Sequence, residues 1–431
     1  MNEQMTTSES KTGYPHVRGG ALQKKTLWVL AVGTILGGLG VGAALSVGAL
    51  LLAEVSGNDA ISGLASATFG AGAAVAGIPL AKLASKYGRR RAIVTGNLIA
   101  AAGAATSVFS TVIGSWPVLA LGLALVGVAS AVQLLARFTA TDLAKPSQRA
   151  RDLSLVVWSI TIGAVVGPNL IKPGGVIGAA LGLTPLAGVF VFAFFAQLVA
   201  ATVSWNGLKP DPLLVARSLP VETDSISTQN GKKSAIVGSK KVQLAVIGII
   251  AISQAVMVGL MAMTPLHLMH HGGSHELVGI TLSLHIAGMY ALSPIFGMLA
   301  TKYGRIPVIH LGWAILLVTA FLAFIAGESH AITIIALTLL GLGWSAVTVA
   351  GATLITELTP AKDRTKRQGQ SDAFMSGAGA VAGALSGVGF AIAGFPLLAV
   401  LSAVLVVFGF FLVMWVTSAL RKESLKPLGV E

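Results

Sequence analysis

The basic residues of this chain fall almost entirely in every second gap between its long apolar runs. The 431 residues contain twelve such runs, and 27 of the 29 lysines and arginines lie in the two tails and in the gaps on the N-terminal side. Of the other two, Lys172 lies in a gap on the opposite side and Arg137 lies inside a run. Lys and Arg remain in the cytoplasm when a membrane protein inserts. The pattern therefore predicts an even number of crossings, with both termini cytoplasmic.

The composition agrees with an integral membrane protein. Hydrophobic residues make up 54% of the chain and charged residues only 10%, against about 25% charged in a typical soluble domain. A run of about 20 apolar residues spans a bilayer as a helix. The net charge of +13 lies in the predicted cytoplasmic loops, where anionic lipid accounts for it and no nucleic-acid partner is required. Since there is no cysteine, disulfides and thiolate chemistry are excluded.

The apolar runs divide into two sets of six. The runs predict an all-α integral membrane protein with spans, to within a few residues, at 27–52, 60–82, 92–112, 118–140, 153–172, 185–206, 242–266, 277–299, 308–326, 331–356, 370–394 and 396–418. The longest polar stretch, 207–241, contains three prolines and six basic residues and is typical of a cytoplasmic linker. We therefore predict a cytoplasmic tail (1–25), a six-helix bundle (26–206), the linker, a second six-helix bundle (242–420) and a cytoplasmic tail (421–431).

The two sets are copies of each other. The sequence LASKYGR at 83–89 recurs as LATKYGR at 299–305, an offset of 216 positions. One loop later, 141–143 (TDL) corresponds to 356–358 (TEL), an offset of 215, and an arginine follows each acidic residue by seven positions (Arg149 and Arg364). Two independent matches at nearly one offset indicate internal duplication. We therefore expect the two bundles to be pseudo-symmetric.

On these residues the chain resembles, over essentially its whole length, the major facilitator superfamily of secondary transporters, which is built from such repeats. The most specific feature is the family's loop signature G-x-L-x-D-x-x-G-R-[KR]. The first copy here matches it at Leu83, Gly88, Arg89 and Arg90, and the second at Gly297, Leu299, Gly304 and Arg305. The acidic position departs from the signature, since it is Ser85 in one copy and Thr301 in the other.

The chemistry of these loops predicts a conformational latch. Glycine permits the tight turn at each helix end, and the arginine beside it can bridge to a carboxylate at the end of a neighbouring helix. Such a bridge would favour one face of the protein staying closed, whereas the alternative is that the arginines only fix topology. The latch candidates are Gly88, Arg89, Arg90 and Asp142 in the first half, and Gly304, Arg305, Glu357 and Arg364 in the second.

The fifth predicted span carries the motif Gly163-x-x-x-Gly167-Pro168. Glycines four apart allow close approach of two helices, and proline kinks the helix that follows. The motif resembles the antiporter signature of drug–proton exchangers in the superfamily, and this resemblance implies export. Helix packing alone is the alternative. The arginine that such exporters carry early in the fourth helix is absent, because the corresponding residue is Leu123.

Ionisable side chains inside the apolar runs are few, and the candidates among them are Arg137, His285 and Asp372. An ionisable residue within the membrane is costly and suggests a transport pathway. The resemblance implies that the fourth, eighth and eleventh helices line the cavity, which favours an inward-facing Arg137 that meets an anionic group; the alternative is that its side chain extends to the interface. His285, near mid-helix, is the first candidate for proton carrier, or else a buried core histidine. Asp372 is the second, although we expect it in a first helical turn, where the dipole alone favours a carboxylate.

Other polar or amphipathic side chains lie within the spans that the resemblance places around the cavity. They are Gln133, Trp158, Asn169, Gln254 and Trp344. With so few fixed charges, we expect a mostly apolar cavity and a lipophilic or weakly charged solute. On the outer side, His267, His270, His271 and His275 adjoin Glu276. Because Gly272 and Gly273 break any helix there, we expect a solvated loop rather than a metal site.

Together these features predict a multi-pass transporter of the cell membrane that exports a small hydrophobic compound or metabolite, with protons as the coupling ion and the bilayer as its surroundings. We expect it to function as a monomer, without a cofactor or a metal. The alternatives are uptake by proton symport and, from another class, a receptor or scaffold that kept the fold without transport. An enzyme is not expected, because no nucleophile–base set lies within a span.

Overall fold

The fold is built from helices throughout its described part. The computed structural model describes residues 20–145, 148–219, 238–360 and 363–424, and every element within them is helical. Most helices are apolar around their whole circumference rather than along one stripe, as in α1 and α8. This is the pattern of a helix with apolar surroundings on all sides. The predicted all-α membrane class is confirmed at this level.

The helices up to residue 218 follow the predicted spans closely. They are α1 (Ala21–Ser56), α2 (Asp59–Ser62), α3 (Leu64–Tyr87), α4 (Arg89–Val112), α5 (Trp116–Asp142), α6 (Arg149–Val166), the 3-10 helix η3 (Gly167–Leu170), α7 (Ile171–Ala180), the 3-10 helix η4 (Pro185–Ala187), α8 (Gly188–Gly207) and α9 (Pro212–Ser218). Because Pro168 follows Gly167 directly, the α6 geometry gives way to η3 at the predicted kink.

The helices from residue 240 onward repeat this order. They are α10 (Lys240–Met261), α11 (Thr264–His270), α12 (His275–Tyr290), α13 (Ser293–Tyr303), α14 (Arg305–Ile325), α15 (His330–Glu357) and α16 (Arg364–Ser424). The backbone of α16 leaves helical geometry at Ala393 (φ −145°) and Gly394 (φ 66°), just before Pro396. This break falls between the predicted spans 370–394 and 396–418.

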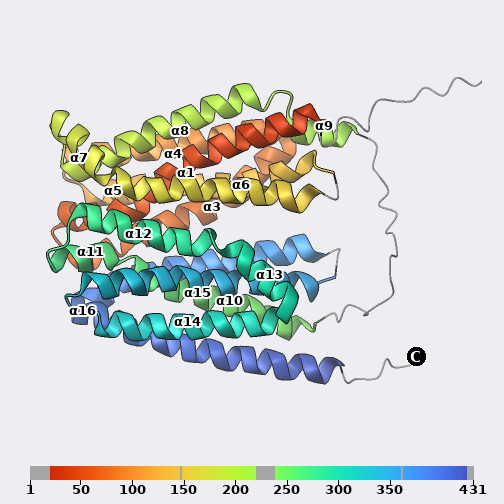
Figure 1. Ribbon diagram of the computed structural model, residues 1–431. Coiled ribbons are helices and arrows are strands. Elements are labelled where there is room, and N and C mark those ends of the chain that lie inside the picture. The colour runs from red at the N-terminus through yellow and green to blue at the C-terminus, as the bar shows by residue number, and fades with distance from the viewer. Residues whose placement is uncertain (1–19, 146–147, 220–237, 361–362, 425–431) are drawn as a thin grey trace, which may run out of the picture.

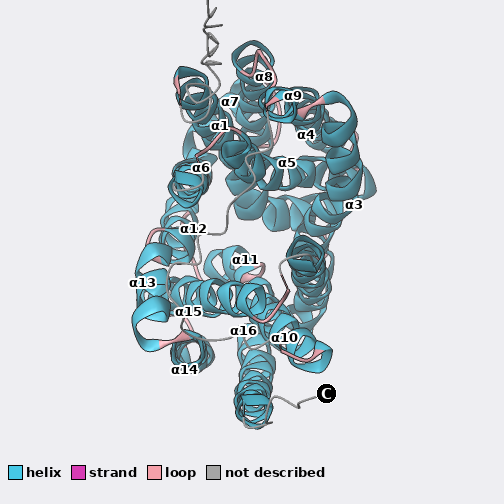
Figure 2. Ribbon diagram, turned by 90° about the vertical axis from the view of Figure 1, so that its right-hand side faces the viewer, coloured by secondary structure: helices cyan, strands magenta, loops and turns pink. Residues whose placement is uncertain are grey.

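Eleven helical stretches in the described residues are long and apolar enough to cross a membrane, and the last of them, Arg367–Glu423, has 57 residues. In Figures 1 and 2 the elements α1 to α9 lie together in the upper part of the molecule, and α10 to α16 lie in the lower part. Buried side chains from both parts join one hydrophobic core, while a second core lies among α1, α3, α4 and α5.

The segment predicted as a linker is partly ordered onto the first half. Within 207–241, helix α9 packs against the ends of α4 and α5, and residues 220–237 lie outside the described part, as do residues 1–19 and 425–431. Asp211 holds α9 in place: its Oδ1 accepts the N–H groups of Leu213 and Leu214, and its Oδ2 accepts the N–H of Arg90, 2.8 Å away. One carboxylate thus caps α9 and anchors it to the start of α4.

Candidate functional site

One contact between the two halves is a line of small residues, which we call the α3–α16 seam. A methyl group at Gly63 would lie 2.5 Å from the carbonyl oxygen of Gly383, and one at Gly383 would lie 2.8 Å from the Cβ of Ser66. Further along, Gly70 meets Ala380 at 3.6 Å. Farther along α3 and α16, Gly77 and Gly377 have open space where their side chains would be. The seam is therefore closed near Gly63 and open toward the loop that holds Gly88.

Other contacts between the halves lie at the same closed end. The amide of Asn169 donates to Ser283 Oγ (2.7 Å), and that hydroxyl donates to the carbonyl of Val165 (2.8 Å). Lys172 pairs with Glu276 at 2.6 Å. Asp59 and His270 form a further ion pair across the halves, at 3.3 Å. The end with the basic loops 82–91 and 300–307 is thus the end at which the halves separate.

Three polar side chains from both halves come together on the open side of the seam. Arg137 of α5, Tyr290 at the end of α12 and Asp372 of α16 interact electrostatically with one another through Arg137. All three are half-buried. Neither Arg137 nor Asp372 makes a direct hydrogen bond or ion pair in the part of the chain that the structure describes. A cation and a carboxylate from opposite halves therefore lie within electrostatic range of each other without a direct contact, and both can bind a third group.

An aromatic and amide chain extends this cluster into the second half. The Tyr290 and Trp344 rings meet edge to face, with centroids 6.0 Å apart. The indole N–H of Trp344 donates to Gln254 Oε1 at 2.7 Å. Arg137, Asp372, Gln254 and Trp344 were all sequence candidates, and the structure gathers them around Tyr290. We call these five residues the central cluster.

The expectation that Asp372 lies in a first helical turn is wrong. Helix α16 begins at Arg364, eight residues earlier, and the effect of the helix dipole falls off within the first turn. The dipole therefore does not explain a carboxylate at this position. Its neighbours across the seam, rather than its own helix, provide the reason for it.

His285 lies away from the central cluster. Its side chain is completely buried between α12 and α15, where Nδ1 bonds to the carbonyl of Leu337 at 2.8 Å and Nε2 has no partner among the described residues. A neutral imidazole held in this way joins two helices of the same half. The geometry favours Asp372 over His285 as the group that faces the opening.

The remaining polar candidates are dispersed. Gln133 points into the interior of the first half, next to Thr34, Gly37 and Asn97, with its Nε2 buried and unpartnered within the described part. Trp158 is 56% exposed. Asn169 joins the halves at the closed end, as described above. None of these three belongs to the central cluster.

The GxxxGP motif packs against α1. A methyl group at Gly163 would collide with the carbonyl oxygen of Ile35, and one at Gly167 would lie 2.8 Å from the Cα of Gly42. This contact lies within the first half. Pro168 reaches the other half, because its carbonyl oxygen lies 2.9 Å from where a Cβ of Gly279 would be. The motif therefore combines tight helix packing with a contact between the halves.

Both arginines of the loop signatures bind the carboxylates expected for them. Arg89 donates two hydrogen bonds to Asp142, from Nε to Oδ2 at 2.9 Å and from Nη2 to Oδ1 at 3.2 Å. Arg305 donates two hydrogen bonds to Glu357 Oε1, from Nη2 at 2.5 Å and from Nε at 3.1 Å. Arg305 also donates to the carbonyl of Ala300. We call these two contacts the latch pairs. Each lies within one half, and whether they act as a latch stays a prediction.

The loop glycines turn the chain in the way the sequence requires. Gly88 (φ 92°) and Gly304 (φ 97°) adopt backbone angles that favour glycine. The Asp211 carboxylate lies directly against Gly88, where a side chain would collide with it. The guanidinium of Arg90 lies 3.8 Å from the ring centroid of Trp205, a cation–π contact. The side chain of Arg364 lies outside the described part.

The expectation of a solvated loop for the outer histidines is wrong for His267. Residues 264–270 form α11, and His267 is only 4% exposed, with its ring stacked on Phe395 at 4.4 Å. The expected helix break does occur at Gly272 (φ 76°). Across the described residues, no three His, Cys, Asp or Glu side chains are arranged to hold a metal ion.

The sequence is similar to transporters over most of its length. The family model of the Major Facilitator Superfamily matches residues 30–272 and 244–431. The chain belongs to the major facilitator superfamily. It is 36% identical to an uncharacterized MFS-type transporter of Bacillus subtilis, YdeG, over 85% of this chain and 86% of that one. It is 26% identical to the riboflavin transporter RfnT of Brucella anthropi, over 84% and 88%.

Solved structures share the fold of this superfamily member. A bacterial homolog of the human lysosomal transporter Spinster, in an inward-facing and unoccupied conformation, aligns with a TM-score of 0.73 at 17% identity, over 94% of this chain and 99% of that one. The chain is therefore a multi-pass membrane transporter by family and by fold. Members of such a transporter family act by moving solutes rather than as enzymes.

Sequence reasoning missed two residues of interest. Tyr290 connects Arg137 to Trp344 in the central cluster. The sequence feature that could have identified it is a phenol within a predicted cavity-lining span that has few other polar groups. Asp211 anchors α9. The Asp-Pro pair 211–212 could have identified it, since Asp is favoured as an N-cap and proline at the first helical position.

Proposed function

We propose that this transporter exports a small, largely apolar solute in exchange for protons by alternating access. In this proposal twelve helices cross the cell membrane as two six-helix bundles, with both termini in the cytoplasm, and the monomer is the functional unit. The central cluster binds the solute. The arrangement of the seam, closed near Gly63 and open near Gly77, corresponds to a cavity that opens to the cytoplasm.

One observation carries this proposal: Arg137 and Asp372, from opposite halves, interact electrostatically without a direct contact, on the open side of the seam. Relative motion of the halves changes their separation, so it changes the cost of leaving either charge without a partner. A solute or a proton that binds between them therefore biases which face is open. Arg137 stays protonated at physiological pH, so Asp372 is the group that exchanges a proton.

The charge of the solute decides the direction of coupling. A solute that donates a hydrogen bond or a positive charge to Asp372 competes with the proton for the same oxygen atoms, and such competition produces exchange. A solute that binds Arg137 through a negative group instead favours protonated Asp372, and this produces symport. We favour exchange because the GxxxGP motif resembles that of exchangers, whereas symport of an acidic solute is the second candidate.

The two directions differ in how pH changes solute affinity. With purified protein, candidate solutes are screened by thermal shift, since a true ligand stabilises the folded state by mass action. Riboflavin is the first compound to test, because it is named in a relative that shares 26% identity. Under exchange, the Kd of the solute rises as pH falls through the range in which Asp372 titrates. Under symport, the Kd falls.

Two variants complete the test. Asp372→Asn removes the exchangeable proton, so the pH dependence of the Kd should vanish and uptake into inverted vesicles should no longer follow an imposed proton gradient. Arg137→Gln should weaken the binding of a solute that binds Arg137 through a negative group. A ligand that binds wild type and is never moved across the bilayer would favour a receptor. Gradient-driven transport that persists in Asp372→Asn would overturn the coupling proposal.

A further inference from the structure

Two ion pairs join the halves at the closed end. One is Lys172 Nζ with Glu276 Oε1 at 2.6 Å, between α7 and the start of α12. The other is His270 Nε2 with Asp59 Oδ2 at 3.3 Å, between α11 and α2. Both pairs must separate if this end opens. They differ in chemistry, since an ammonium–carboxylate pair keeps both charges between pH 5 and 8, whereas an imidazole changes charge in that range.

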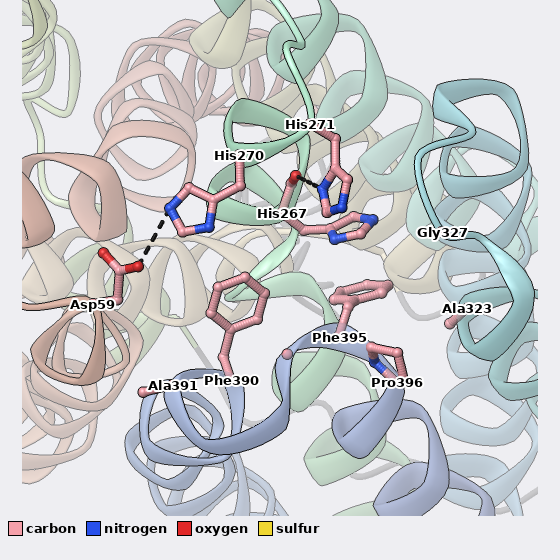
Figure 3. Close-up of a pocket in the computed structure, with 11 residues that line it drawn as sticks. Asp59, His267, His270, His271, Ala323, Gly327, Phe390, Ala391, Phe395 and Pro396 are labelled. Carbon is pink, nitrogen blue, oxygen red and sulfur yellow. Dashed lines mark hydrogen bonds and ion pairs between the residues drawn. The ribbon is translucent and has the colours of Figure 1, made fainter.

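The Asp59–His270 pair is open to the outer medium. It lies at the edge of a cavity of about 420 Å³ lined by His267, His271, Phe390 and Phe395 among others. Figure 3 shows His270 turned toward Asp59 across the mouth of this cavity, with the Phe390 ring below. The side chains of His270 and Asp59 are 47% and 41% exposed. Protons from outside therefore reach the pair without entering the transport pathway.

The groups around His270 leave Asp59 as its acidic partner. Its own helix contributes the imidazoles of His267 and His271, and α15 contributes His330, which bonds to the carbonyl of His271 at 3.1 Å. From α16 it meets the apolar ring of Phe390. Glu54, near the end of α1, is exposed. A proton on His270 thus adds positive charge to a histidine cluster. The carboxylate of Asp59, in the other half, neutralises that charge.

We propose that Asp59 and His270 form a proton-binding site in the outer gate, by which protons outside the cell hold the outer end closed. This rests on the alternating access proposed above. With His270 protonated, the pair is ionic and resists opening. With His270 neutral, only a weaker hydrogen bond remains, and the outer end opens more often. Lys172–Glu276 resists opening to the same extent throughout.

The test uses a cysteine as a reporter of the outer seam. The chain has no cysteine of its own, and a thiol at Ser66→Cys, a partly buried position packed against Gly383, becomes more accessible when the seam opens. Its labelling rate with an impermeant maleimide is measured between pH 5.5 and 8. Each rate is divided by that of the same protein unfolded in detergent at the same pH, which removes the pH dependence of the thiol itself.

In Ser66→Cys protein the normalised rate should rise with pH, by up to about five-fold, the range of an exposed ion pair. His270→Gln and Asp59→Asn should each give a high rate that no longer depends on pH. Lys172→Gln is the matched control, because it should raise the rate at every pH and keep the slope. Asp372→Asn should also keep the slope, which separates the gate from the coupling proton.

Two results would overturn the gate. One is an unchanged pH slope in both His270→Gln and Asp59→Asn, and the other is a slope that disappears in Lys172→Gln. A Ser66→Cys thiol that is never labelled at any pH, even with Lys172→Gln, would contradict alternating access itself, and the gate proposal with it. Failure of the gate alone is therefore distinguishable from failure of the transport mechanism.

Discussion

At the scale of single residues, the position of a polar group in the helix bundle decides its role more than its chemistry does. His285 and Asp372 both lie within apolar spans and both can carry a proton. Asp372 is half-buried and faces the cation Arg137 of the other half, while His285 is enclosed and bonded to its own half. Only Asp372 changes its surroundings when the halves move.

The corresponding prediction compares these two residues directly. His285→Ala should lower the melting temperature, because it removes the bond to Leu337 and leaves a cavity between α12 and α15, and it should leave the dependence of transport on the proton gradient intact. Asp372→Asn should do the opposite. The measurements are thermal unfolding in detergent and transport in proteoliposomes under imposed gradients. Loss of coupling in His285→Ala at normal stability would return His285 to the role of proton carrier.

A second prediction concerns Gly163, whose α-carbon packs against the backbone of α1. Gly163→Ala should destabilise the protein by roughly 1–3 kcal/mol, because the added methyl group collides with the Ile35 carbonyl and forces the helices apart. Gly259→Ala in α10 is the control, since open space surrounds that position and alanine suits a helix better than glycine by about 0.5–1 kcal/mol. Equal melting temperatures for the two variants would contradict this packing argument.

At the scale of elements, the latch pairs hold neighbouring helices together inside each half. Arg89–Asp142 joins the start of α4 to the end of α5, and Arg305–Glu357 joins the start of α14 to the end of α15. Asp211 adds α9 to the first of these contacts by binding the N–H of Arg90. In the first half, the contact between α4 and α5 is therefore joined to a further helix, α9.

Charge reversal tests whether these pairs influence the conformational balance. Arg89→Asp or Asp142→Arg should change the labelling of cysteines at Gly377 and Ser66 in opposite directions, and the double reversal should partly restore both. Reversal at Arg305 and Glu357 provides the matched comparison in the other half, where the glutamate is 48% exposed and a smaller effect is expected. Labelling that stays the same in every single variant would leave the pairs with a topological role only.

The sequence predicted which helix ends contact each other better than it predicted which face of each helix points inward. The latch pairs could be expected because each joins two helix ends that are neighbours in the chain. The position of Tyr290 beside Arg137 could not, since a helix that is apolar on all sides gives no periodic signal of which face points inward. Asp211 was hidden in a segment whose prolines and charges are typical of a linker. Asp372 was misplaced because the polar residues 364–371 were not expected to be helical.

At the scale of the whole molecule, all of the contacts between the halves described above lie on one side of the central cluster. The basic loops lie on the other side. That end of the molecule faces the viewer in Figure 2. The uneven distribution of lysine and arginine thus coincides with the end at which the seam opens, so that the opening should face the cytoplasm.

Reporter fusions test this orientation. A fusion at Gly231, outside the described residues, should report a cytoplasmic location, and one at Gly273, after α11, an external location. Alkaline phosphatase and fluorescent protein activities give opposite readouts at the two sites. The same location for both would disprove the predicted number of crossings and the direction of the opening together.

The α3–α16 seam also gives experimental control over conformation. Its contacts near Gly63 are made by backbone and Cβ atoms, whereas the longer side chains of the Lys172–Glu276 and Asp59–His270 pairs join the halves outside it. A bulky residue in place of Gly387 would point its side chain at the carbonyl oxygen of Ala60. The closed arrangement has no space for that side chain. Such a variant would populate the opposite arrangement without any ligand, and so provide the outward-facing state for structure determination.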